Sequence, residues 1–144
     1  KRFDYIFVKE NKYPGVLTLN DHQISDRPFT LDSKLVQPIN VLHNTLPILG
    51  YRIDKFAYIT DAKTVSDAEV EKLKGLDVLV VNALRIEPHV SHFNLEEALA
   101  FIKRVNPKKA FLTHLSHHLG FHNDIEKILP ETVNLAYDQL QISI

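Results

Sequence analysis

The first half of the chain is dominated by alternating apolar and polar positions, the pattern of half-buried strands. This alternation and the turn residues between the runs predict strands over 16–19, 29–31, 35–42, 49–53 and 55–60. Pro38 interrupts the longest run, which favours an edge strand or a bulge because proline has no N–H for a strand partner. Asp54 lies between the last two runs, where it suits a tight hairpin.

The second half combines continuous apolar runs with runs of helical period. Residues 77–81 and 110–112 are typical of strands buried on both faces. Ser66 and Glu69 have the spacing of a capping box, and Asn94 can cap the next helix. Together with Pro107 and Pro130 as stops, the pattern predicts helices over 67–74, 95–106 and 124–129, and terminal strands over 133–137 and 140–144.

Strands followed by a strand–helix–strand–helix–strand order predict an α/β protein with a mixed sheet and helices packed outside it. Residues 1–144 show no repeat, low-complexity stretch or linker, so we expect one structural unit. The chain starts without a methionine or a start signal, and we expect it to be a fragment or a processed chain.

Composition narrows the function classes. A net charge of −1 argues against a large non-specific nucleic-acid footprint. No apolar run approaches the roughly 18 residues of a membrane span. The absence of cysteine excludes disulfides, thiolate metal sites and a cysteine nucleophile, and fits a cytoplasmic protein.

Three residues with metal-binding side chains lie at the ends of predicted strands: His43, Asp61 and His114. Strand ends are where an α/β scaffold presents its site residues. Two imidazoles and a carboxylate suit zinc, manganese or iron. Each residue also has a purely structural interpretation, Asp61 as a turn cap and the two histidines as hydrogen-bonded core residues.

Four segments resemble, in order, the phosphodiesterase branch of the metallo-β-lactamase superfamily, best the group that includes the cyclic phosphodiesterase of phosphonate breakdown. They are 57–61 (Ala-Tyr-Ile-Thr-Asp), 91–98 (Ser-His-Phe-Asn-Leu-Glu-Glu-Ala), 113–117 (Thr-His-Leu-Ser-His) and 135–138 (Leu-Ala-Tyr-Asp). The resemblance implies the C-terminal half of an αββα sandwich. The family's His-x-His-x-Asp-His motif is absent from this chain, as is the glycine expected where Gln139 stands.

The resemblance also implies roles for individual residues. His43 would complete the shell of one metal, Asp61 would bridge two divalent ions (Zn²⁺ or Mn²⁺), and His114 would bind the second. His92 would face the substrate as a catalytic acid without binding metal. The implied reaction is hydrolysis of a small cyclic or diester phosphate by a metal-activated water.

The roles of two further residues, His117 and Arg85, remain open between two interpretations. His117 is either a hydrogen-bond partner of the metal site or a solvated histidine at the start of a helix. Arg85 either contacts phosphate or forms a structural ion pair.

Two alternatives to the phosphodiesterase remain. One is an RNA 3′-end processing endonuclease of the same superfamily, although nucleic acid is the less favoured partner. The other is a catalytically silent fragment that only pairs with the missing N-terminal half. The isolated chain should be inactive and bind metal poorly, since most ligands of the family are absent. We expect the sheet face of the half-sandwich to be covered in a homodimer or by that half, and no membrane association.

Overall fold

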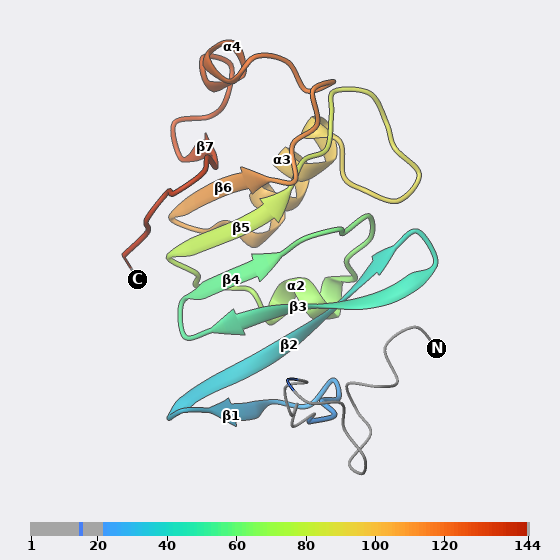
Figure 1. Ribbon diagram of the computed structural model, residues 1–144, viewed down its shortest axis with the longest axis vertical. Helices are drawn as coiled ribbons and strands as arrows, with labels where there is room; N and C mark the ends of the chain where they lie inside the picture. The colour runs from blue at the N-terminus through green and yellow to red at the C-terminus, as the bar shows by residue number, and fades with distance from the viewer. Residues whose placement is uncertain (1–14, 16–21, 144) are drawn as a thin grey trace.

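The computed structural model describes residue 15 and residues 22–143, so the strand predicted over 16–19 lies outside the described residues. Within them, seven strands form one sheet in chain order (Figure 1). The strands are β1 (Phe29–Leu31), β2 (Lys34–His43), β3 (Leu46–Ile53), β4 (Phe56–Ile59), β5 (Val78–Asn82), β6 (Lys109–Thr113) and β7 (Val133–Leu135). Neighbours from β1 to β4 are antiparallel, and those from β4 to β7 are parallel. The predicted mixed sheet is confirmed.

One face of the sheet is closed by helices. α2 (Asp67–Glu71) and α3 (Leu95–Val105) lie behind the sheet in Figure 1, and α4 (His122–Glu126) lies near β7. Alternate strand residues point into this layer and are fully buried, among them Ile59, Leu79 and Leu112. The apolar stripe of α3, which includes Phe101 and Ile102, completes the core. None of the described helices is long and apolar enough to cross a membrane.

The opposite face carries a row of three aromatic residues and one valine. Tyr51, Tyr58, Val80 and Phe111 are neighbours across four strands. Tyr58 is 44% exposed, whereas its neighbour Val80 is only 5% exposed. No helix of the described part covers this face (Figure 1). A covering partner for it remains a prediction.

The free edge of β2 explains the tolerated proline. β1 pairs with β2 only as far as Val36, so beyond it the strand has β3 on one side alone. The N–H groups of Asn40 and Leu42 point away from β3 and donate to the Glu69 carboxylate (3.0 Å) and to the Thr64 carbonyl (2.9 Å). Pro38 has the same orientation along the strand and needs no acceptor, which confirms the edge interpretation.

Several details differ from the sequence-based expectations, among them α2, which ends at Glu71 and not at residue 74. Residues 140–143 are not a strand, β7 ends at Leu135, and α4 spans His122–Glu126 instead of 124–129. Ser66 accepts from the Glu69 N–H as predicted, but the Glu69 carboxylate reaches β2 and Lys72 and does not close the capping box. Gln139 has a left-handed φ of 69°, the conformation for which a glycine is favoured.

Candidate metal centre

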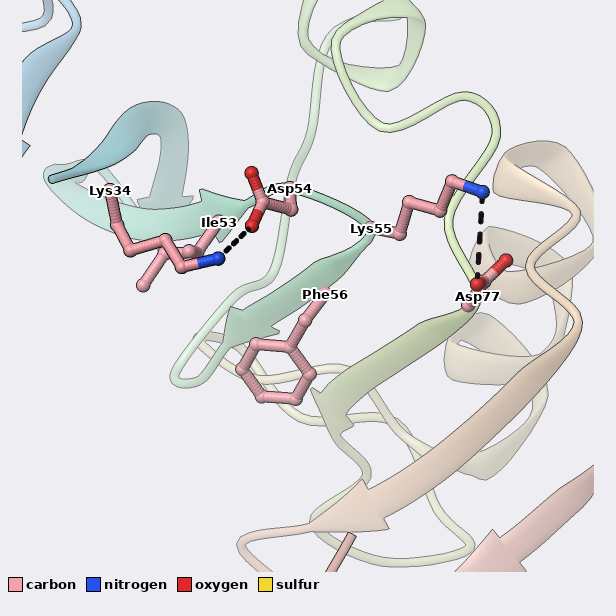
Figure 2. Close-up of a pocket in the computed structure, with 6 residues that line it drawn as sticks. All are labelled: Lys34, Ile53, Asp54, Lys55, Phe56 and Asp77. Carbon is pink, nitrogen blue, oxygen red and sulfur yellow. Dashed lines mark hydrogen bonds and ion pairs between the residues drawn. The ribbon is translucent and has the colours of Figure 1, made fainter. Parts of the chain in front are cut away.

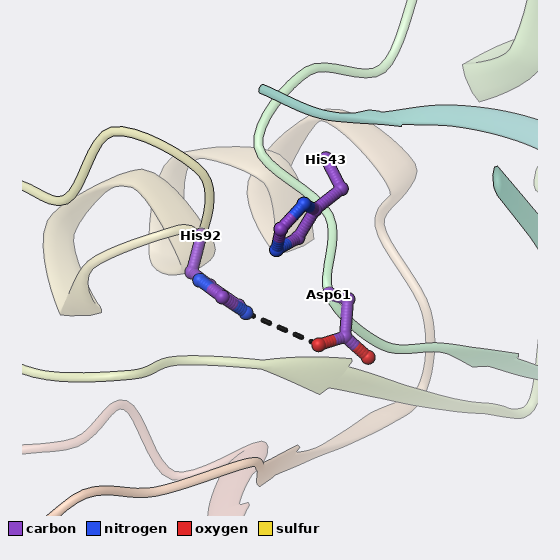
Figure 3. A group of neighbouring side chains, drawn as sticks. All are labelled: His43, Asp61 and His92. Atoms are coloured by element: carbon purple, nitrogen blue, oxygen red, sulfur yellow. Dashed lines mark hydrogen bonds and ion pairs between the residues drawn. The ribbon is translucent and has the colours of Figure 1, made fainter. Parts of the chain in front are cut away.

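The carboxyl ends of β2, β4 and β6 meet at one edge of the sheet, because these strands run in the same direction. His43 is the last residue of β2, Asp61 follows β4 by two residues, and His114 follows β6 directly. The loop between β5 and α3 brings His92 to the same place. Figure 3 shows His43, Asp61 and His92 directed toward a common point.

Asp61 is the centre of this cluster. Its Oδ1 lies 3.1 Å from Nε2 of His92 and 3.5 Å from Nε2 of His114. The His92 ring stacks on the His114 ring at 4.8 Å and meets the edge of the His43 ring at 4.7 Å. Four side chains from four separate segments therefore share one small volume.

Two residues of the cluster have an unfavourable backbone conformation. Asp61 has a φ of 59° and His114 a φ of 58°, in the left-handed region that residues other than glycine rarely occupy. Such a conformation costs on the order of 1 kcal/mol or more and persists only where the surrounding structure enforces it. Neither residue is in a hairpin turn, so the strain falls on the candidate site itself.

Asn82 provides the constraint at Asp61. It is the last residue of β5 and is completely buried. Its Oδ1 accepts from the Ala62 N–H at 2.8 Å, and its Nδ2 donates to the Ala62 carbonyl at 3.0 Å. The side chain thus acts like a strand partner and holds the peptide that follows Asp61. In the sequence, the signal for this role is a polar residue at the end of an apolar strand, which does not by itself indicate a contact with the site.

Burial and charge set the protonation of the two central groups. Burial alone would raise the pKa of Asp61, but hydrogen bonds from His92 and Thr60 and the charges of His114 and His92 hold that pKa below its usual value. Burial lowers the pKa of His92, and this outweighs the hydrogen bond to Asp61 that acts to raise it. The lowered pKa of Asp61 favours the carboxylate anion, which could bind a metal ion through its oxygen atoms.

The donor set fits a divalent ion. One ligand atom each of His43, Asp61 and His92 lies within 4.8 Å of the others. Ligand atoms about 2.0–2.2 Å from a tetrahedral zinc lie roughly 3.3–3.6 Å apart, so the most widely separated pair would have to approach by about an ångström. The sequence-based ligand set has His114 in the place of His92. Since both imidazoles approach the same oxygen of Asp61, their assignment as ligand or acid is part of the proposal below.

A cavity of about 410 Å³ opens beside this cluster. His43, Thr60 and Asp61 line its polar side, and Leu46, Ile48 and Leu49 of the β2–β3 hairpin line its apolar side. A substrate with an apolar portion can therefore lie beside the ionisable groups.

Arg85 and His117, the two residues with open roles, make their described contacts outside the cluster. Arg85 donates to the carbonyls of Glu87 (3.2 Å) and Pro88 (2.7 Å), so it supports its own loop, and the structural ion pair that was one of its two possible roles is not formed among the described residues. His117 is exposed, and its ring packs against His118 at 3.8 Å. The structure does not bring either side chain to Asp61.

The family follows from a match to a domain model. Residues 1–115 match the model described as the beta-lactamase superfamily domain. The match covers most of the chain and includes all four clustered residues. The chain belongs to this superfamily, and the predicted fold class is confirmed.

The individual relatives are longer proteins than this chain. A solved diphosphatase of the PhnP family has 33% identity and a TM-score of 0.83, over 85% of this chain and 48% of its own. YhfI of Bacillus subtilis shares the fold with 19% identity and a TM-score of 0.67, over 94% of this chain and 57% of YhfI. Human tRNase Z, short form, shares it with 22% identity and a TM-score of 0.63, over 81% of this chain and 45% of that protein. An octanoyltransferase of Porphyromonas gingivalis (strain ATCC BAA-308 / W83) is 37% identical over 99% of this chain, which spans only 29% of that protein. The chain thus spans about half the length, or less, of these relatives.

Proposed function

We propose that the protein containing this chain is a metal-dependent phosphodiesterase that cleaves a small cyclic or diester phosphate. The observation that carries the proposal is the convergence of His43, His92 and His114 on Asp61 at one sheet edge. The similarity to a diphosphatase at 33% identity supports chemistry at phosphorus.

Each residue has a distinct role in this proposal. His43, Asp61 and His114 would hold two divalent ions, zinc or manganese, together with ligands from the rest of the protein. Bound ions of this kind supply Lewis acidity and activate water at neutral pH. His92, whose side chain is 12% exposed, delivers a proton from Nε2 to the leaving alkoxide. Asn82 and the strained backbone keep Asp61 in place.

A second candidate is hydrolysis of an octanoyl ester or thioester. It is favoured by the octanoyltransferase relative and by the apolar wall of the cavity beside His43 and Asp61. Because most of that relative lies outside the match, its name can describe the remaining part of the protein. An RNA endonuclease is disfavoured by the net charge of −1.

The test is His92→Ala in the intact protein, with exposed His118→Ala as the matched control. In His92→Ala, kcat on an alkyl or ribosyl phosphodiester should fall roughly 10²–10⁴-fold, the usual contribution of an acid–base group. A nitrophenyl diester should lose much less, because nitrophenolate leaves without a proton. Metal content should be unchanged.

Three results would contradict the proposal. Equal losses on both diesters would remove the acid role, and loss of metal from His92→Ala would make His92 a ligand. Turnover of an octanoyl thioester without turnover of any phosphodiester would select the second candidate.

A further inference from the structure

The β2–β3 hairpin extends beyond the strand that follows it in the sheet. β2 and β3 pair along the whole hairpin, as far as His43 and Leu46, whereas the pairing of β3 with β4 ends at Tyr51 and Tyr58. Residues 46–49 therefore project past the last pair that β3 makes with β4 (Figure 1). The cavity beside the candidate metal centre is lined by this projecting segment and by the two residues that follow β4.

The projecting segment is apolar although solvent reaches it. Leu46 is 59% exposed, and Ile48 and Leu49 are only partly buried. No Asp, Glu, Lys or Arg occurs between Lys34 and Arg52. Exposed apolar surface of this kind commonly marks a place where a ligand or a partner binds. The side chains of Leu46, Ile48 and Leu49, here called the hairpin wall, line the same cavity as two of the candidate metal ligands, so a ligand on the wall lies beside the metal centre.

The hairpin is fixed against the segment that follows Asp61. Leu42 and Thr64 exchange two backbone hydrogen bonds, of 2.9 and 3.2 Å. Gly50 allows β3 to lie close to β4, since a Cβ at this position would come within 2.8 Å of Cγ1 of Ile59. The hairpin wall is therefore held beside Asp61 before a ligand arrives, and a preorganised surface of this kind lowers the ordering cost of binding.

We propose that the hairpin wall is a specificity subsite that binds an alkyl ester group of the substrate while the phosphate lies at the candidate metal centre. The cavity of about 410 Å³ falls in the range of small-molecule sites, roughly 300–1,000 Å³. Each methylene that leaves water on such a surface should improve binding by up to about fourfold. The identity of the substrate as a phosphodiester rests on the proposed function, whereas the apolar subsite does not.

The chain length of the substrate tests the subsite in the intact protein. Along dimethyl, methyl propyl and methyl hexyl phosphate, KM should fall about twofold to fourfold per added methylene while the chain remains in the cavity, with kcat little changed. Leu46→Ala should raise KM for the hexyl ester about tenfold and leave KM for the dimethyl ester unchanged. Leu35→Ala is the matched control, because Leu35 is 58% exposed and lies at the opposite end of β2. It should leave every KM at the wild-type value.

A binding measurement does not require turnover. By isothermal titration calorimetry, hexylphosphonate should bind the metal-loaded intact protein at least about 30-fold more tightly than methylphosphonate. Leu35→Ala should keep this preference, and Leu46→Ala should reduce it about tenfold. Equal affinities in the wild type, or a full preference in Leu46→Ala, would overturn the subsite.

The two measurements also separate the subsite from the proposed function. A preference for hexylphosphonate without cleavage of any phosphodiester would remove the proposed function and leave the subsite standing. Cleavage of the three diesters with no effect of chain length would do the reverse. A lower unfolding midpoint of Leu46→Ala with an unchanged chain-length preference would show that the rest of the protein covers Leu46, and would overturn the proposal.

Discussion

The two ends of the same sheet treat their charged groups differently. At the carboxyl ends of β2, β4 and β6, three imidazoles approach one carboxylate (Figure 3). At the opposite end, charges are paired locally: Lys34 with Asp54 at 2.7 Å, and Asp77 with Lys108 at 2.8 Å and Lys55 at 4.0 Å. Figure 2 shows Lys34, Asp54, Lys55 and Asp77 around a cavity with Ile53 and Phe56.

This difference separates a site from a solvated surface. The pairs of the opposite end are well exposed, with side chains of Lys34 and Asp54 that are 62% and 60% accessible. Lys34, Lys55 and Lys108 each already have a carboxylate partner there, and exposed pairs of this kind generally contribute little to stability. At the carboxyl end, three imidazoles face one carboxylate and two of these four residues have a strained backbone, so nitrogen and oxygen lone pairs that could bind a cation are held close together.

The largest effect should follow loss of a proposed ligand at the carboxyl end. His114→Ala in the intact protein should lose metal and activity together, by several orders of magnitude, since metal binding lowers the pKa of water from about 15.7 to about 7. Metal analysis beside kinetics provides the measurement. Full metal content with full activity would exclude His114 from the site.

Asn82→Ala should have the next largest effect, on stability. It leaves the N–H and carbonyl of Ala62 without their partners in a buried position, which costs roughly 2–4 kcal/mol in the free energy of unfolding. Urea unfolding of the variant and the wild type measures this. A change below about 0.5 kcal/mol would show that the clamp is dispensable.

The loss of stability at acid pH should differ between the partly buried pair of Glu97 and Lys63, near the carboxyl end of the sheet, and the exposed pairs of Asp77 at the opposite end. Burial acts to raise the pKa of Glu97, but the hydrogen bond from Lys63, the Asn94 N–H and the Lys63 charge leave it lowered. A lowered folded-state pKa means that the stabilisation is present above the ordinary value of 4.5 and is lost as pH falls below it. Glu97→Gln should therefore flatten the acid limb of stability against pH more than Asp77→Asn does. The measurement is the free energy of unfolding of both variants between neutral and acid pH. Equal slopes of stability against pH in the two variants would contradict this prediction.

The smallest effect should come from Asp77→Asn at neutral pH. Loss of the exposed pairs with Lys55 and Lys108 should change the free energy of unfolding little, and less still at high salt, because solvent and ions screen them. Denaturant midpoints at low and high salt would measure it. If Asp77→Asn lowered the free energy of unfolding as much as Asn82→Ala does, the distinction between the two ends of the sheet would not hold.

The sequence predicted much of this because the informative signals were local. Strand alternation and the residues after each strand placed His43, Asp61 and His114 at one edge, and the caps Ser66 and Asn94 were recognised from their spacing. Contacts across the chain left no such signal. The Asn82–Ala62 clamp and the Glu69 bond to β2 join residues through tertiary packing, and Arg85 turned to nearby carbonyls that any loop offers.

The closed edge of β2 has a consequence for association. An edge strand with free N–H and carbonyl groups is a template on which another chain can add a strand and begin to aggregate. Beyond Val36, the outward N–H groups of β2 are absent at Pro38, bound to Glu69 at Asn40 and bound to Thr64 at Leu42. A single buried carboxylate on a short helix thus helps protect the protein against edge-to-edge polymerisation, and Glu69→Ala should expose that edge.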